Sequence, residues 1–375
     1  MIQANNVTLR IGKNALFEDV NIKMNPGVEP NAVVMEVDVK EKRTGTFGVG
    51  AGYSSADGII GMVNVADTNL FGTGDAVSLT YQMSGDDSDA RGFVFSYRHP
   101  WIDSKETTGT IKIYNRTYEY SDYDTDGHLK ESYMRKYSGG EITLGRPISE
   151  YSTNYITLKN RKDSYVKHED DGNVVSKNDD GTISWGAHDK AWKDYNFGTT
   201  RSIIFQHVTD TRDNVYNPTE GGKASITAEV AGFGGDFDFQ KASLEGNHYY
   251  KVGHAQVIAV RGEIGYAHGH LSEFNQFRLG GQDNLRGYRD DQFRGDRMGL
   301  FTVEYRFPLA KKVQGAIFTD WGSAWSDRAL PEASDIHGSI GAGVALNTPL
   351  GLLRLDYGHG DNGKGRVHFS VGGMF

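Results

Sequence analysis

The sequence predicts an all-β protein, a 16-stranded antiparallel transmembrane β-barrel preceded by a short α/β segment at residues 1–43. Apolar and polar residues alternate with a period of two from Thr44 onward, as in strands with two different faces. The composition, with 20 Tyr, 18 Phe and 48 Gly in 375 residues, favours strands and turns over helices. No run approaches about 18 consecutive apolar residues, which excludes a transmembrane helix. A barrel stays possible, because its strands show only every second residue to lipid.

Sixteen alternating segments can be counted, and each has about the length that a tilted strand needs to cross a bilayer. Short turns alternate with long polar loops at 120–133, 165–198 and 269–297, an asymmetry typical of outer-membrane barrels. Sixteen such segments are too many for one soluble β-sandwich, which is the alternative architecture. The segments are 45–54, 58–69, 75–84, 90–99, 106–119, 134–146, 151–164, 199–210, 222–232, 238–251, 255–268, 298–308, 313–322, 336–346, 351–358 and 365–375.

Residues 1–43 differ from the rest of the chain. Leu16, Phe17 and Val20 have helical spacing, and a hairpin is expected after them, with Val33 and Val37 on one face. A piece of about forty residues is too short to hold a good core alone. The segment is therefore predicted to be a small α/β unit in front of the barrel domain at 44–375.

Several classes of function find no support in the sequence. The formal net charge of −9 does not favour nucleic acid as a partner, and the lack of cysteine excludes disulfides and Cys-ligated zinc. Asp122, Asp124 and Asp126 imitate the start of an EF-hand loop, but its twelfth position is Tyr133 instead of glutamate. No G-x-S-x-G motif is present. We therefore expect no enzyme activity, no cofactor and no metal site.

Several segments together resemble the BamA-type outer-membrane assembly and translocation superfamily. Residues 12–43 resemble the second half of a polypeptide-transport-associated (POTRA) domain, and LGGQDNLRGYRDD is similar to the family's long sixth extracellular loop. TVEYRFPL, IFTDWGSAW, TPLGLLRLDYGHG and the terminal strand resemble the last strands of the family's barrel. DTRDNVYNPTEGG is similar to a family turn between two mid-barrel strands, with Asp210, Arg212, Asp213, Pro218 and Gly221 as its motif residues.

The resemblance implies a role for the loop at 269–297, which would fold back into the barrel lumen. Arg286 would then meet Glu304 and Asp320 on inward-facing strand positions. A guanidinium group can bridge two carboxylates, which lysine cannot imitate. Gly287 would allow a tight turn beside this contact, and Tyr288 would pack on the inner wall. The alternative is that these residues are solvated loop charges.

The resemblance also implies a lateral seam between the first and last strands, both of which are rich in glycine. Glycine weakens cross-strand packing, so the seam could open sideways and expose a strand edge to an incoming client strand. The alternative is that these glycines accommodate barrel curvature. The last strand also ends on an aromatic residue, as the clients of barrel-assembly machinery do. The seam residues are Gly45, Gly48, Gly50, Gly52, Gly365, Gly372, Gly373 and Phe375.

Taken together, the resemblance implies an assembly factor in the outer membrane of a diderm bacterium, with a periplasmic N-terminus. Such a protein folds and inserts β-barrel clients through its seam without using ATP. Its expected partners are unfolded outer-membrane clients and the lipid bilayer, with periplasmic chaperones or accessory lipoproteins as further partners. The alternatives are a polypeptide-translocating pore of the two-partner-secretion type and a passive porin. The sequence contains only part of a POTRA domain, which puts recruitment of periplasmic partners in doubt.

Overall fold

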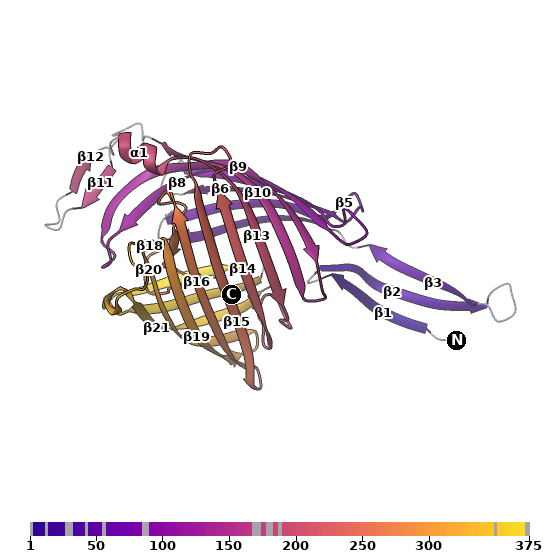
Figure 1. Cartoon of the computed structure of the whole chain (residues 1–375). Helices are drawn as coiled ribbons and strands as arrows, with labels where there is room; N and C mark the ends of the chain where they lie inside the picture. Colours follow the sequence, from indigo (N-terminus) through magenta and orange to yellow (C-terminus); the bar gives the residue numbers. More distant parts are fainter. Residues whose placement is uncertain are drawn as a thin grey trace.

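The computed structural model of the chain is nearly all-β (Figure 1). It describes residues 3–11, 14–26, 33–41, 44–54, 58–84, 90–166, 174–177, 183–186, 190–348 and 351–371. Two helical segments are present in these ranges, α1 (Lys190–Asn196) and the single 3₁₀ turn η1 (Ala333–Asp335). Neither they nor any other described segment forms a helix long and apolar enough to span a membrane.

A single 16-stranded sheet accounts for most of the chain, and each of its strands pairs antiparallel with its neighbour in sequence. All sixteen predicted segments are strands of this sheet, so the predicted fold class is confirmed. The strands are β4 (Gly45–Ser54), β5 (Gly58–Leu70), β6 (Asp75–Ser84), β7 (Arg91–His99), β8 (Thr108–Tyr123), β9 (Leu129–Pro147), β10 (Ser152–Val166), β13 (Gly198–Asp210), β14 (Gly221–Ala231), β15 (Phe239–Gly253), β16 (Gln256–Gly269), β19 (Arg297–Ala310), β20 (Val313–Trp325), β21 (His337–Thr348), β22 (Gly351–Gly360) and β23 (Gly365–Val371).

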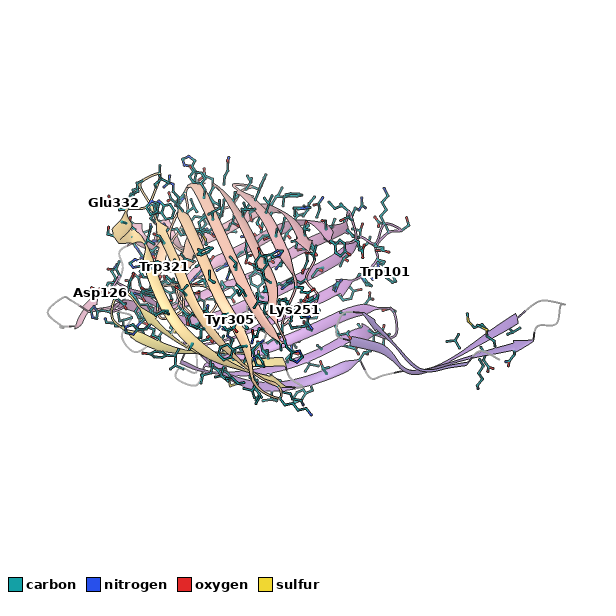
Figure 2. All side chains as sticks on the ribbon, turned by 90° about the horizontal axis from the view of Figure 1, so that it is seen from below. Trp101, Asp126, Lys251, Tyr305, Trp321 and Glu332 are labelled. Carbon is teal, nitrogen blue, oxygen red and sulfur yellow. The ribbon has the colours of Figure 1, made fainter. Side chains whose placement is uncertain are left out.

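The sheet curls until its two edge strands, β4 and β23, approach each other. No hydrogen-bonded ladder joins them over the parts of both strands that the structure describes, so the sheet is not closed there. Its two ends differ. Figure 2 shows Trp101 and Lys251 toward the end with short turns, and Asp126 and Glu332 at the end with long loops. The sheet therefore has the end-to-end asymmetry that the sequence predicts.

Side chains on the two faces of the sheet differ in character, as the alternation predicts. On β20, Ile317 and Trp321 are each 51% exposed on the outer face, whereas Phe318 and Asp320 between them are buried. An outward apolar face and an inward polar face are typical of strands that meet lipid outside and a polar lumen inside. Aromatic side chains are also exposed near the short-turn end, as in the interfacial belts of membrane proteins. They are Phe71, Trp101, Tyr151, Tyr216 and Tyr250.

The N-terminal segment forms a three-stranded antiparallel sheet of β1 (Gln3–Ile11), β2 (Asn14–Pro26) and β3 (Val33–Glu41). It extends from the short-turn end of the large sheet (Figures 1 and 2). The helix predicted around Leu16 is wrong, because this stretch belongs to β2. A central strand satisfies its backbone groups by pairing on both sides, and that tertiary context overrides the helical spacing.

The long loops contain more regular structure than the sequence predicts. Most of 120–133 belongs to β8 and β9, so the predicted loop is reduced to a tight turn at Asp124–His128. The connection at 165–198 contains α1 and a small hairpin of β11 (Val174–Lys177) and β12 (Ile183–Gly186). Within 269–297, β17 (Phe277–Leu279) pairs with β18 (Phe293–Gly295) and closes the intervening residues into a compact lobe.

Candidate functional site

The lobe between β17 and β18 lies against the inner face of the sheet through apolar side chains. Leu279, Leu285 and Tyr288 are fully buried and share a core with Phe237 and Leu300. Burial of this apolar surface offsets part of the entropy lost when so long a connection adopts one conformation. It also brings the charged residues of the lobe to the wall of the sheet.

Arg286 lies at the centre of the site and is fully buried. Its Nε and Nη2 each donate a hydrogen bond of 2.8 Å to a different oxygen of Asp320 on β20. Its Nη1 donates to Glu304 Oε2 on β19 over 2.7 Å, and its backbone N–H donates to Asp320 Oδ2 over 3.1 Å. The structure thus brings together the three residues that the resemblance connects. The guanidinium carbon also lies 3.3 Å from the ring centroid of Phe318.

Three further charged residues complete this network, and the sequence reasoning missed them. Arg354 on β22 donates to Glu304 Oε2 over 2.6 Å and to Asp356 Oδ2 over 2.7 Å. Arg306 donates to Glu304 Oε1 over 2.6 Å, and Asp356 Oδ2 lies 3.5 Å from Arg286 Nη1. The sequence does carry a signal for them: charged residues alternate with apolar ones in LLRLDYG and in VEYRF.

The network balances three positive charges (Arg286, Arg306, Arg354) against three negative ones (Glu304, Asp320, Asp356), and all six side chains are buried. Burial alone would lower the pKa of the Arg286 guanidinium, but its hydrogen bonds to Asp320 and the nearby carboxylates raise this pKa above its ordinary value. The charges of the network therefore depend on one another, because loss of one leaves its partners uncompensated in a site without access to solvent.

Gly287 and Tyr288 fix the loop to the last strands. Gly287 has φ of +94°, and a Cβ atom there would lie 3.1 Å from backbone atoms of Gly358 and of Gly360. Its N–H donates to His368 Nε2 on β23 over 3.0 Å. The Tyr288 hydroxyl donates to the carbonyl of Gly338 over 2.9 Å and contacts Asp361 Oδ1 at 2.5 Å. Burial and the hydrogen bond to Asp361 raise the pKa of Tyr288, so the phenol stays protonated as a donor. The Arg-Gly-Tyr triplet thus contacts both β19–β20 and β21–β23.

Arginines at the outer part of the lobe hold the β8–β9 hairpin. Arg294 donates from Nη1 to Asp122 Oδ1 over 2.9 Å and from Nη2 to Oδ2 over 3.1 Å. Arg289 Nε donates to the carbonyl of Gly127 over 3.1 Å. The tripeptide Arg294-Gly295-Asp296, which resembles a cell-adhesion motif, is therefore turned toward the protein. Two other arginines bind nearby acidic residues: Arg278 on β17 binds Asp291 in the lobe, and Arg297 at the start of β19 binds Asp296.

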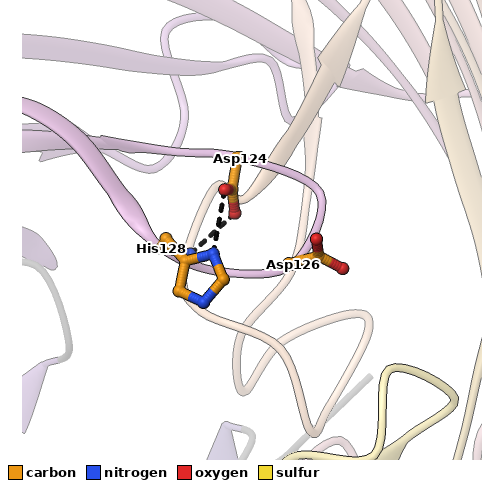
Figure 3. Close-up of side chains that lie close together, drawn as sticks. All are labelled: Asp124, Asp126 and His128. Atoms are coloured by element: carbon orange, nitrogen blue, oxygen red, sulfur yellow. Dashed lines mark hydrogen bonds and ion pairs between the residues drawn. The ribbon is translucent and has the colours of Figure 1, made fainter. Parts of the chain in front are cut away.

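Asp124, Asp126 and His128 gather at the turn of this hairpin (Figure 3). The backbone N–H of His128 donates to Asp124 Oδ1 over 2.7 Å, and its Nδ1 lies 3.0 Å from Asp124 Oδ2. Lys364 reaches the same turn, with its Nζ 2.6 Å from the Asp126 carbonyl and 3.2 Å from His128 Nε2. The ammonium group of Lys364 thus already binds at this acidic turn. We interpret the cluster as a contact between the β8–β9 and β22–β23 hairpins.

The predicted turn motif joins β13 to β14 at the short-turn end, and its residues interact locally. Arg212 binds Asp210 through two hydrogen bonds of 2.8 and 2.6 Å. Asp213 accepts hydrogen bonds from the backbone N–H and the hydroxyl of Thr219, over 2.8 and 2.6 Å. Gly221 has φ of +84° and lies tightly against the Thr211 carbonyl, and Pro218 is buried beneath the turn. The motif thus shapes the turn between β13 and β14.

The predicted seam residues lie on the two edge strands where the structure describes them. Gly45, Gly48, Gly50 and Gly52 belong to β4, and Gly365 begins β23. A Cβ atom at Gly48 would meet nothing within 4 Å, whereas one at Gly365 would collide with the Tyr357 hydroxyl. Gly365 therefore lies against the Tyr357 side chain, whereas Gly48 has no such neighbour. Three of the predicted residues lie outside the described range, namely Gly372, Gly373 and Phe375.

Comparison with known proteins places this architecture in a family. Residues 69–375 match the Omp85 superfamily domain. The outer membrane protein assembly factor BamA of Nitratidesulfovibrio vulgaris is 27% identical over 98% of this chain and 46% of that protein. The chloroplastic outer envelope protein 80 of Oryza sativa subsp. japonica is 26% identical over 95% of this chain and 54% of that protein. The chain thus spans about half the length of these relatives.

Solved structures agree with this placement at the level of the fold. The crystal structure of BamA from Haemophilus ducreyi lacking POTRA domains 1–3 has a TM-score of 0.69 at 19% identity, and covers 96% of this chain and 76% of that chain. CdiB from Acinetobacter baumannii has a TM-score of 0.61 at 14% identity, and covers 95% of this chain and 65% of that chain. Because the superfamily match extends over more than half of the sequence, the chain belongs to the Omp85 superfamily.

Proposed function

We propose that this chain is the membrane-embedded part of an outer-membrane protein assembly factor in a diderm bacterium. It folds and inserts client β-barrel proteins through the seam between β4 and β23, without enzymatic chemistry, a cofactor or a metal. Membership of the Omp85 superfamily and the similarity to BamA proteins support this function. The observation that carries it is the pair of edge strands, which approach each other without a hydrogen-bonded ladder over their described parts.

The β4 edge has the properties needed to template a client strand. Along an edge strand, alternate N–H and C=O groups have no partner within the sheet and can pair with an added strand. Phe47 and Val49 are 71% and 70% exposed on its outer face, so an added strand would meet apolar side chains where lipid is expected. Addition of client strands to this edge would lower the cost of bringing unpaired backbone groups into a bilayer.

The network around Arg286 supports the opposite edge. Arg354 and Asp356 lie on β22, and His368 lies on β23, the strand at the seam. Through these residues the loop holds the last hairpin against β19 and β20. The β23 edge is thereby fixed from inside, while the β4 edge is free to exchange partners. We infer that the loop sets the shape of the seam.

The ends of the sheet suggest an orientation. In outer-membrane barrels the short turns face the periplasm and the long loops face outward. The N-terminal sheet of β1–β3 extends from the short-turn end, so we propose that it is periplasmic and receives unfolded clients. Its resemblance to part of a POTRA domain stays a prediction, and so does the recruitment of chaperones or accessory lipoproteins.

A polypeptide-translocating pore is the second candidate, and the similarity in fold to CdiB favours it over a passive porin. Proteoliposomes separate the three functions. With the chain reconstituted alone, we expect faster folding of an added denatured barrel client than in protein-free liposomes, measured by its resistance to protease. Export of a soluble partner polypeptide without client folding would favour the pore, and a large steady conductance without either activity would favour the porin.

A further inference from the structure

We propose that the outer face of β8, β9, β10 and β13 at the long-loop end binds an outer-leaflet lipid with a phosphorylated headgroup. The acyl chains of this lipid lie in an apolar groove, and its phosphate binds Arg201 and Lys162. The site lies on the outside of the sheet and is separate from the Arg286 network and from the seam. The inference rests on the proposed membrane location and is independent of client insertion.

The groove has a volume of about 610 Å³ and crosses four strands. Its apolar lining includes Ile113 on β8, Ile142 on β9, Leu158 on β10 and Ile203 on β13. Gly140 lies between these side chains, paired with Ile113 on one side and Asn160 on the other. Because glycine has no side chain, the row of outward residues is interrupted there, which leaves room for an acyl chain.

Basic side chains follow the apolar rows toward the long-loop end. Arg201 lies two residues beyond Ile203 on β13, roughly 7 Å along the strand. The partner of Arg201 is Asn160, and Lys162 lies two residues further along β10, within reach on the same face. Lys136 on β9 extends the series by one more row. Arg201 and Lys162 are both exposed. Positive charge thus begins where the apolar band ends.

The outward-facing cations differ from the inward-facing cations of the same strands in the groups that they bind. Inward-facing Arg135 and Arg161 bind Asp163 at 2.6 and 2.9 Å. For Arg201, Lys162 and Lys136, by contrast, no carboxylate lies within ion-pair distance in the part of the chain that the structure describes.

Arg201 is held in place by neutral acceptors. It donates from Nε to Asn160 Oδ1 over 3.2 Å and from Nη1 to the Gly234 carbonyl over 3.0 Å. The carboxylate of Asp236 in the adjacent loop accepts a hydrogen bond from the backbone N–H of Thr199 over 2.6 Å instead of pairing with Arg201. The two neutral contacts fix the guanidinium group but leave further N–H donors for a ligand.

The chemistry of this arrangement selects a lipid phosphate. A cation on the lipid-facing side is costly at the bilayer midplane and nearly without cost at the interface, so basic residues are favourable where phosphates lie. A guanidinium group binds phosphate through paired hydrogen bonds, and an ammonium group adds a point charge. A free anion would gain nothing from the apolar groove below, whereas a lipid uses both parts of the site.

Lipid retention measured by native mass spectrometry tests this proposal. The detergent-solubilised chain is titrated with a phosphorylated, multiply acylated glucosamine disaccharide, and in parallel with its dephosphorylated form and with inorganic phosphate. The variants are Arg201→Gln/Lys162→Gln and a matched control, Lys223→Gln/Lys251→Gln, which removes two cations near the short-turn end. Heat-modifiable gel migration confirms that each variant is folded.

We expect the Arg201/Lys162 variant to bind the phosphorylated lipid at least tenfold more weakly than the wild type and the control variant. The dephosphorylated lipid should bind all three proteins equally and weakly. Equal retention of phosphorylated lipid by the wild type and the Arg201/Lys162 variant would overturn the proposal. Inorganic phosphate that binds the wild type as tightly as the lipid does would also overturn it, because the groove would then contribute nothing. Failure of client insertion would leave this result unchanged, so the two proposals fail separately.

Discussion

At the scale of single residues, Arg286 shows why the site requires arginine. Its guanidinium group binds Asp320 with two parallel hydrogen bonds and still reaches Glu304 with a third nitrogen. An ammonium group has no planar fork and cannot match both carboxylates at once. Because Arg286 is fully buried, its removal would strongly destabilise the protein: two carboxylates would remain without their partner.

Replacement of Arg286 should therefore destabilise the protein strongly. We expect Arg286→Ala to lower the free energy of unfolding by about 3–5 kcal/mol and Arg286→Lys to restore only part of it. Urea titration in detergent micelles, followed by heat-modifiable migration, measures this change, and limited proteolysis reports the release of the loop. Arg328→Ala is the control, because Arg328 forms partly exposed ion pairs with Glu332 and Asp335 and should change stability by less than about 1 kcal/mol. Equal stability of Arg286→Ala and the control would contradict this account.

Gly287 provides a second residue-level prediction. Gly287→Ala combines a positive φ with a Cβ atom 3.1 Å from the backbone of Gly358, so we expect a loss of about 1–3 kcal/mol in the same titration. Gly363→Ala is a matched control, because its φ is +74° but a Cβ atom there would meet nothing within 4 Å. The difference between the two variants isolates the close approach of the loop to β22. No difference would mean that this approach contributes nothing to stability.

The residues of the site were predictable only in part. The resemblance connected Arg286 with Glu304 and Asp320, and alternation assigned Asp320 to the inner face of its strand. Arg354 and Asp356 were missed, because alternation tells which face a residue occupies but not which residues meet it across the sheet. That information requires the register of β19, β20 and β22, which a single sequence does not contain.

At the scale of elements, the β8–β9 hairpin acts as a clamp on the loop. Its strands extend beyond the membrane-crossing length, and their inward Tyr120 and Tyr133 pack with Phe274 of the loop. This explains why 120–133 resembles a polar loop in sequence: beyond the membrane-crossing length the outer face of a strand has no lipid to meet and needs no apolar side chains. The failed helix at Leu16 has a similar origin, since pairing with β1 and β3 decides its conformation.

If the β8–β9 hairpin clamps the loop, residues of the hairpin and of the loop should be energetically coupled. In a double-mutant cycle of Arg294→Gln and Asp122→Asn, we expect an interaction energy of about 1 kcal/mol and faster proteolysis of the loop in each single variant. Lys130→Gln is the control, because Lys130 lies 3.6 Å from Asp122 with an exposed side chain. Strict additivity of the Arg294 and Asp122 variants would show that the ion pair does not hold the hairpin.

At the scale of the whole molecule, the loop contacts one edge of the sheet, at β22 and β23. The loop joins β19, β20, β22 and β23 through buried charges and hydrogen bonds. The sixteen strands followed from alternation and from the turns and loops that separate the segments. A seam between the first and last strands was expected from the resemblance and from their glycines. Alternation alone does not predict whether it closes, because closure depends on pairing energies at two strands and not on the pattern within either.

Crosslinking of the seam tests the central claim most directly. The chain has no cysteine, so pairs can be introduced without background at outward positions of the two edge strands, with Phe47→Cys or Val49→Cys on β4 and Val367→Cys or Phe369→Cys on β23. The control is Val65→Cys with Leu79→Cys, two outward residues already paired between β5 and β6.

Client folding in proteoliposomes is then compared before and after oxidation. We predict that the crosslinked seam lowers the rate to that of protein-free liposomes, that reduction restores it, and that the β5–β6 crosslink has no effect. Full activity of a completely crosslinked seam would contradict the account.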